Sequence, residues 1–113
     1  GTVSVVHVQS DGSGSETRKV SVGLDPTGLA LSPDGTALAV ADSGSDQVSL
    51  LQLDAATGAM TSTTLYRSRP PRRAMGTKPL AVSWTPDGHL LVGLAGLDAV
   101  EMLTSTGQPI PRR

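Results

Sequence analysis

Short apolar stretches alternate with turn-forming residues along most of this chain, a pattern typical of an all-β protein. The central part of the sequence predicts four consecutive antiparallel strands over residues 27–31, 36–41, 47–53 and 59–65. Ser32-Pro33-Asp34-Gly35 joins the first two strands, because proline presets φ at a turn and glycine supplies the positive φ that closes a hairpin. The strands before residue 54 are apolar on both faces, which predicts a sheet covered on both sides.

The four-strand pattern recurs along the chain, which indicates a repeat protein. Elements of the central unit return in a later unit at a nearly constant spacing: Pro26 matches Pro79, Leu31 matches Trp84, Pro33-Asp34-Gly35 matches Pro86-Asp87-Gly88, and Val48 matches Val100. Residues 2–6 match residues 47–51, so the chain opens inside a unit. A period of about fifty residues, with about four short strands in each unit, is typical of the blades of a β-propeller.

The repeat divides the chain into four predicted segments. Residues 1–23 form the second half of a blade, residues 24–65 a complete blade, residues 66–77 an inserted loop rich in arginine and proline, and residues 78–113 a third blade with a weak last strand. The fold class is therefore an all-β partial propeller of about two and a half blades. Closed propellers typically have about four to eight blades. We expect the remaining blades to come from a longer polypeptide, or from other chains that complete the ring.

Several motifs of the central unit belong to a recognisable repeat. A proline precedes the inner strand, and an SPDG turn, a small-residue second strand, a Gly/Ser/Asp turn, a VSV-like third strand and D-x-x-T-G follow it, at Pro26, residues 32–35, 39–41, 42–46, 48–50 and 54–58. Together they resemble the YVTN-type propeller repeats of bacterial surface-layer and periplasmic proteins, and the similar seven-bladed lactonase-type propellers. The resemblance covers residues 1–65 and 78–103, and it implies a propeller fold and a periplasmic or extracellular location. The matching residues make turns and blade packing, so they imply no activity.

Composition excludes some classes of protein and site. The chain has 113 residues, a formal net charge of −1 and no cysteine, so it has no disulfide framework and no cysteine-based metal site. Aromatic residues make up 2%, and the core is expected to consist of Val, Leu, Ala and Met. Trp84 takes the place of Leu31 in the repeat, which predicts that it packs between neighbouring blades. No apolar run reaches the roughly 20 residues of a membrane span.

No metal site, cofactor site or catalytic constellation is predicted. His7 lies in a predicted strand and His89 follows a turn, and neither has a second ligand at a metal-binding spacing. The turn at residues 42–46 lacks the further oxygen ligands and the distal glutamate of a calcium loop. We expect the carboxylates of Asp46 and Asp98 to accept backbone N–H groups at their turns.

The arginine loop, residues 66–77, carries a cluster of charge that blade packing does not require. Guanidinium groups pair with phosphate and carboxylate, so the candidates for binding an acidic partner are Arg67, Arg69, Arg72, Arg73 and Lys78. Tyr66 is a candidate to stack on a ligand. Base stacking has little other support, so nucleic acid is not an expected partner. The alternative is a solvated loop whose charge contributes solubility.

Three functions are compatible with the sequence. The first is a non-catalytic propeller segment that serves as a scaffold for protein or ligand binding in a periplasmic or cell-surface protein. The second is part of a propeller enzyme, lactonase-like or quinoprotein-like, with an active site completed by other blades. The third is binding of a polyanion through the arginine loop.

Overall fold

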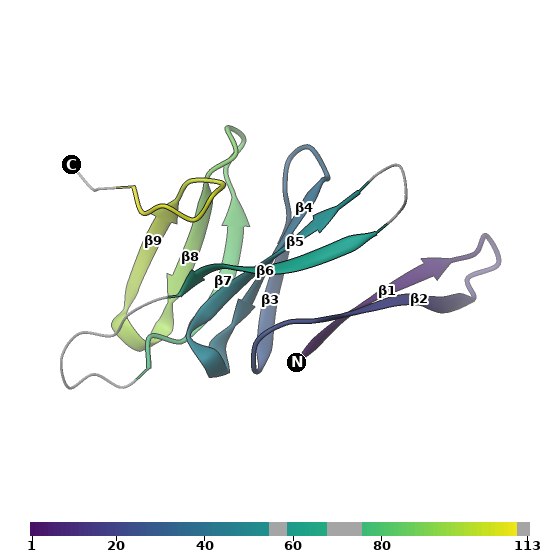
Figure 1. The fold of residues 1–113 in the computed structure, drawn as a ribbon, viewed down its shortest axis with the longest axis horizontal. Coiled ribbons are helices and arrows are strands. Elements are labelled where there is room, and N and C mark those ends of the chain that lie inside the picture. The colour runs from purple at the N-terminus through teal and green to yellow at the C-terminus, as the bar shows by residue number, and fades with distance from the viewer. Residues whose placement is uncertain (55–58, 68–75, 111–113) are drawn as a thin grey trace.

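The computed structural model describes residues 1–54, 59–67 and 76–110, and for residues 62–67 it describes the backbone. This part of the chain contains nine strands: β1 (Thr2–Val8), β2 (Gly14–Ser21), β3 (Pro26–Leu31), β4 (Ala37–Asp42), β5 (Gln47–Leu53), β6 (Met60–Arg67), β7 (Pro79–Trp84), β8 (Leu90–Leu94) and β9 (Ala99–Leu103). Short 3₁₀ turns, η1 (Ser43–Ser45) and η2 (Ala95–Leu97), join β4 to β5 and β8 to β9. The strands form three antiparallel sheets, ordered β1-β2, β3-β4-β5-β6 and β7-β8-β9 (Figure 1). We call these sheets the half-blade, the second blade and the third blade.

The β3–β4 hairpin and the β7–β8 hairpin close through the same turn. Gly35 and Gly88 have φ values of 76° and 89°. Their N–H groups donate to the carbonyl oxygens of Ser32 and Thr85, at 2.9 and 3.0 Å. A side chain would disfavour this positive φ, so glycine at the last position of the turn fixes its shape. The repeated motif thus produces the same local structure in both blades.

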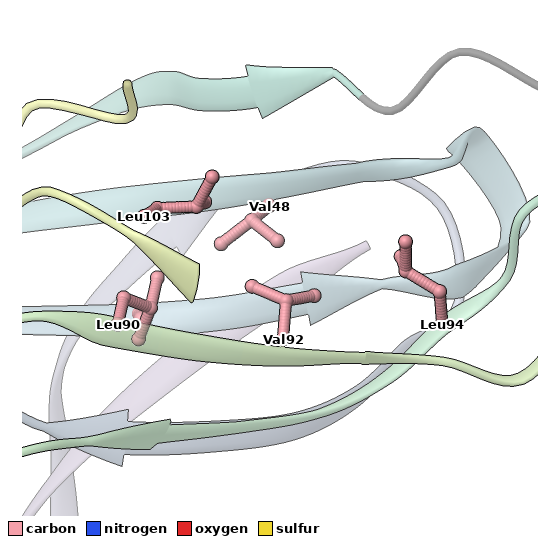
Figure 2. Packing of buried hydrophobic residues seen from close by; sticks show 6 residues of the cluster. Val48, Leu90, Val92, Leu94 and Leu103 are labelled. Carbon is pink, nitrogen blue, oxygen red and sulfur yellow. The ribbon is translucent and has the colours of Figure 1, made fainter. Parts of the chain in front are cut away.

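An apolar cluster joins the second blade to the third. Its buried members are Ala39, Val48, Leu90, Val92, Leu94 and Leu103. Figure 2 shows Val48, which comes from β5, pointing toward Val92 on β8 of the neighbouring blade. Ala39 on β4 contributes a small side chain, which allows the two sheets to approach closely.

Trp84 packs against this cluster from the inner strand β7. Its indole Nε1 donates a hydrogen bond of 2.9 Å to the carbonyl oxygen of Ala30 on β3. The prediction that the tryptophan packs between blades is therefore confirmed. The hydrogen bond also satisfies the single polar group of the indole where the ring is half-buried.

The half-blade covers the opposite face of the second blade. Val3 on β1 forms a buried cluster with Val40 and Leu51. Partly buried side chains surround this cluster, namely Val20, Val22, Leu38 and Met60. The strands β4 and β5 are therefore covered on both faces, as their continuous apolar character predicts.

The fold class is as predicted: an all-β partial propeller with a half-blade, a full blade and a nearly full blade. Two strands extend two or more residues beyond the predicted range at one end. The strand β2 begins at Gly14, not at residue 19, because Gly12 closes a tight turn with φ of 89° and pairing resumes at once. The strand β6 continues through Tyr66 and Arg67, which extends it two residues into the segment expected to be loop. After β9 the described residues form one isolated bridge, between Leu103 and Pro109.

The three sheets form an open arc. The radius of gyration is 14.9 Å and the principal extents are 50 × 28 × 22 Å. A compact domain of this length has a radius of gyration of about 13 Å. In Figure 1 the half-blade and the third blade lie at opposite ends of the arc, with the second blade between them.

Candidate functional site

The described residues that lead from one blade to the next lie at one end of the blades. In the second blade, Pro26 pairs with Asp42, Asp42 with Gln47, and Gln47 with Arg67. The residues before β3, the turn η1 and the start of the arginine loop therefore share this end. The hairpin turns such as Ser32-Pro33-Asp34-Gly35 lie at the opposite end, because the strands are antiparallel.

The residues that enter each inner strand rest on the 3₁₀ turn of the same blade. We call residues 23–25 and 76–78 the entry linkers. The four hydrogen bonds run from Ser43 N to Asp25 O, Gly44 N to Leu24 O, Ala95 N to Lys78 O and Gly96 N to Thr77 O, at 3.1, 3.0, 2.9 and 2.9 Å. At Gly96 a Cβ would lie 2.0 Å from the carbonyl oxygen of Gly76, so no side chain fits. Each of the two blades therefore has the same close contact, within itself, between its entry linker and its 3₁₀ turn.

Four non-glycine residues at this end have left-handed backbone. Asp25 and Lys78, which precede the prolines of β3 and β7, have φ of 49° and 48°. Asp46 and Asp98, which follow η1 and η2, have φ of 54° and 49°. Aspartate tolerates this region better than most residues. The repeat thus places one left-handed residue before each inner strand and one after each 3₁₀ turn.

The Asp46 carboxylate links the second blade to the third. Its Oδ1 accepts a hydrogen bond of 3.0 Å from the backbone N–H of Lys78. A Cβ at Gly76 would lie 2.8 Å from both carboxylate oxygens, so a side chain there would displace the carboxylate from this position. Sequence reasoning predicted that Asp46 accepts a backbone N–H at its own turn. This bond instead reaches the entry linker of the next blade.

Asp42 forms a buried polar group that the sequence analysis missed. The residue is 0% exposed, and its Oδ2 accepts hydrogen bonds from Ser49 Oγ at 2.5 Å and from Gln47 Nε2 at 3.4 Å. A buried carboxylate requires such partners because desolvation of a charge is costly. The alternating pattern of β4, which places Asp42 on the same face as the buried Val40, is the signal that could have revealed it.

Two of the predicted anion-binding residues, Arg67 and Lys78, have their backbones at this end of the blades. Tyr66 and Arg67 pair through their backbones with Val48 and Gln47, and their side chains lie outside the described part of the structure. Arg69, Arg72 and Arg73 also lie outside the described residues. Lys78 is exposed, and its backbone is held by Asp46. The two described ends of the arginine loop are thus attached to consecutive residues, Asp46 and Gln47.

The opposite end carries two acidic turns beside a groove of about 550 Å³ between the second and third blades. The hydroxyl of Ser32, together with the N–H and hydroxyl of Thr36, holds the pKa of Asp34 below its usual value. The hydroxyl of Thr85 does the same for the pKa of Asp87, which also lies 3.3 Å from Nδ1 of His89. These carboxylates stabilise their own turns. Among the described residues, no three His, Asp or Glu side chains are grouped so as to hold a metal ion.

Comparison with known proteins places this arrangement in a family. The sequence model described as "Lactonase, 7-bladed beta-propeller" matches residues 1–75, which is more than half of the chain. The chain belongs to this lactonase propeller family. No curated protein matches it.

Solved structures extend the likeness of this lactonase-family chain to its whole length. A protein from Lactobacillus plantarum is 26% identical, with a TM-score of 0.81 over 99% of the chain and 34% of its own length. A calcium-binding regucalcin from Agrobacterium tumefaciens is 23% identical, with a TM-score of 0.66 over 96% of the chain and 35% of its own length. A luciferin-regenerating enzyme is 20% identical, with a TM-score of 0.67 over 94% of the chain and 33% of its own length. The last two show the fold alone.

The lactonase-family chain spans about a third of the length of these structures. About two thirds of each of these structures therefore lies outside the matched part. No helix in the described part of the chain is long and apolar enough to cross a membrane.

Proposed function

We propose that this chain supplies about two and a half blades of a larger lactonase-type ring, where it acts as a non-catalytic scaffold for protein or ligand binding. The other blades come from the same polypeptide or from other chains. We further propose that the repeats are of the YVTN type and that the protein is periplasmic or located at the cell surface. The SPDG turns and the small-residue strand β4 support the repeat type.

The exposure of repeat-equivalent residues carries this proposal. Leu29 and Leu31 on β3 are 60% and 61% exposed, whereas their equivalents on β7, Val82 and Trp84, pack in the cluster between blades. At the other end of the arc, Val100 on β9 is 52% exposed. Such apolar faces indicate surfaces that bind further protein.

The scaffold role rests on the chemistry of the described residues. The carboxylates of the turns are engaged in turn hydrogen bonds, and Asp42 is buried beneath an entry linker. Asp87 is the one carboxylate of the described turns that lies beside a histidine, 3.3 Å from Nδ1 of His89, and its other partner is the hydroxyl of Thr85 in the same turn. The chain instead carries an insertion, the arginine loop, whose described ends lie at the end of the blades that holds the entry linkers.

Substitutions on the exposed apolar faces test whether a ring is completed. In the complete protein, Leu29→Asp and Val100→Asp place a charge between blades, and each should lower the free energy of unfolding by about 3 kcal/mol or more. Ser10→Asp, in an exposed turn of the half-blade, is the matched control and should change it by less than about 0.5 kcal/mol. Urea unfolding measures the three variants. Equal, small effects for all three would contradict the proposal.

Lactone hydrolysis by the complete ring is a second candidate function, favoured by the match to the lactonase family. Its catalytic groups would come from loops of several blades. Assays of the complete protein with several lactones test this candidate. Turnover would overturn the non-catalytic proposal, and absence of turnover with all of them would count against the enzyme.

The ligand class that we propose for the scaffold is an acidic or phosphate-bearing partner, bound by Arg67, Arg69, Arg72, Arg73 and Lys78. The support is the attachment of both loop ends beside η1, through Gln47 and Asp46. Replacing the four arginines with serine should abolish salt-sensitive retention on heparin. If four phosphates are neutralised, the slope of log K against log salt is about −3.6. If retention on heparin is unchanged by the substitutions, an acidic or phosphate-bearing ligand is ruled out.

A further inference from the structure

The second blade holds the third through a defined set of groups, which we call the entry socket. The carboxylate of Asp46 accepts the N–H of Lys78, and the following Pro79 is fully buried. The hydroxyl of Thr27 donates to the carbonyl oxygen of Leu80 at 3.2 Å. One polar anchor and one buried proline thus fix the point at which the third blade begins.

The third blade repeats this socket on its outer face. Asp98 follows η2 with φ of 49°, as Asp46 follows η1 with φ of 54°. It is exposed, and it lines a groove of about 500 Å³ together with Leu80, Gly93 and Val100. The equivalent space on the second blade is occupied by the start of β7.

A second groove continues the first along the same face. It measures about 570 Å³ and is lined by apolar side chains that include Leu91, Val100, Met102 and Ile110. The repeat equivalents of Val100 and Met102 in the second blade are Val48 and Leu50, which are 0% and 4% exposed against the third blade. The outer face of the third blade therefore continues an interface that the chain already forms once.

We infer that Asp98 is the polar anchor for a further propeller blade, whose inner strand is entered through a Gly-x-x-Pro sequence. The Asp98 carboxylate accepts the N–H of the residue before that proline, and the groove beside it takes the proline ring. This inference rests on the proposed completion of the ring. The occupant is a blade of this repeat type, and not an unrelated strand or helix.

The two entry linkers of the chain define what the socket accepts. Both read Gly-x-x-Pro, as Gly23-Leu24-Asp25-Pro26 and Gly76-Thr77-Lys78-Pro79. The glycine leaves the anchoring carboxylate in its place, because a Cβ at Gly76 would lie 2.8 Å from both of its oxygens. The residue before the proline has left-handed backbone in both linkers, and in the second linker its N–H, that of Lys78, donates to the preceding blade.

One difference between the two sockets increases the importance of Asp98. The second blade has Thr27 and Gly28 at its inner strand, and a Cβ at Gly28 would lie 2.9 Å from the carbonyl oxygen of Leu80. The third blade has Leu80 and Ala81 at these positions. It lacks the threonine hydroxyl and has an added methyl group. The hydrogen bond that the Asp98 carboxylate accepts is then the main polar contact of this socket.

Amide hydrogen exchange in the complete protein tests the inference. Asp98→Ala should accelerate exchange of the amide before the proline in the next Gly-x-x-Pro linker by about tenfold or more, because a hydrogen bond to a charged acceptor is lost. Asp46→Ala is the matched control and should accelerate exchange at Lys78 by a similar factor. Asp98→Asn keeps an acceptor oxygen and should have a smaller effect.

The outcome separates this inference from the proposal on which it rests. Accelerated exchange confined to the next entry linker supports the anchor. Unchanged exchange there, while Asp46→Ala accelerates exchange at Lys78, overturns it. If Val100→Asp still destabilises that protein, the ring proposal survives the loss of the anchor. If Val100→Asp is also neutral, both are overturned.

Discussion

Leu31 and Trp84 occupy the same position of the repeat but have different surroundings. Leu31 is 61% exposed on β3, whereas Trp84 packs against the buried cluster between the second and third blades. The inner strands on which they lie begin with the same entry geometry. The difference in exposure between Leu31 and Trp84 therefore arises from the presence or absence of a neighbouring blade, and not from the structure of the blade itself. A large apolar side chain on an uncovered face marks where a neighbour belongs.

The third strands of the same two blades, β5 and β9, show the reverse arrangement: here the second blade is covered and the third blade is exposed. Val48 is fully buried because the third blade covers it, and its equivalent Val100 is 52% exposed because the described residues place no blade beyond it. The strands β4 and β5 of the second blade are thus covered on both faces, while its inner strand β3 and the last strand of the third blade, β9, each expose apolar side chains. Comparing the second and third blades therefore separates the strand structure, which each blade forms by itself, from the burial of its apolar side chains, which depends on the neighbouring blade.

The largest expected effect comes from shortening the two equivalent inner-strand side chains. Trp84→Ala should lower the free energy of unfolding by about 3 kcal/mol, because it empties space between two blades. In the isolated 113-residue chain, Leu31→Ala should cost less than about 0.5 kcal/mol, and in the complete protein about 2 kcal/mol or more. Urea unfolding of both forms measures this. A Leu31 effect that is small in both forms would mean that the face has no neighbour.

A smaller effect is expected from adding a methyl group at the two equivalent glycines of the 3₁₀ turns. Gly96→Ala should cost about 2 kcal/mol, because its Cβ meets the backbone carbonyl oxygen of Gly76. Gly44→Ala should cost less, since its Cβ meets the Asp25 carboxylate, a side-chain group that can move. Thermal unfolding of the two variants compares them. Equal losses would show that the two turns are held with the same rigidity.

The buried hydrogen bond between Ser49 and Asp42 in the second blade can be removed one partner at a time. Ser49→Ala should cost roughly 1–2 kcal/mol, because a buried carboxylate oxygen of Asp42 loses its closest partner. Adding Asp42→Leu, the residue that the third blade has as Leu94, should recover part of this loss. A double-mutant cycle by urea unfolding measures the coupling. Additive losses would mean that Asp42 and Ser49 act independently.

The smallest expected effect concerns the two acidic hairpin turns. Hydrogen bonds from Ser32 and Thr36 lower the pKa of Asp34, and Thr85 lowers that of Asp87, below the usual 3.8. Because the folded-state pKa is lowered, the resulting stability is present above pH 3.8 and is lost as the pH falls through the folded-state value. Carboxyl titration by NMR measures both pKa values, and Thr36→Val should raise that of Asp34 alone. A pKa of 3.8 or higher in the unmodified turn would refute the effect.

The strands and hairpins could be predicted because their signals are local. Ser32-Pro33-Asp34-Gly35 sets a turn through φ preferences that act within four residues. The last residues of β6 could not, because Tyr66 and Arg67 pair across a bulge between Val48 and Ser49, and the charged sequence gives no sign of this pairing. Strand length beyond the apolar pattern depends on a partner strand.

The sequence predicted which chemical groups the candidate site contains, but not which residues they contact. A carboxylate at Asp46 that accepts a backbone N–H followed from turn chemistry. Its partner, Lys78, is 32 residues away, and this contact depends on how two blades are placed. The burial of Asp42 likewise depends on the linker at Gly23, where a Cβ would lie 2.7 Å from the Cβ of Asp42.

The chain contains a single tryptophan, and its indole N–H donates to Ala30 across the boundary between the second and third blades. The fluorescence of Trp84 therefore reports on one boundary among the three sheets. If the two blades part, water reaches the ring and the emission maximum moves to longer wavelength. Opening between the half-blade and the second blade leaves the emission unchanged. The protein thus has a built-in optical probe for whether its blades separate one at a time or all together.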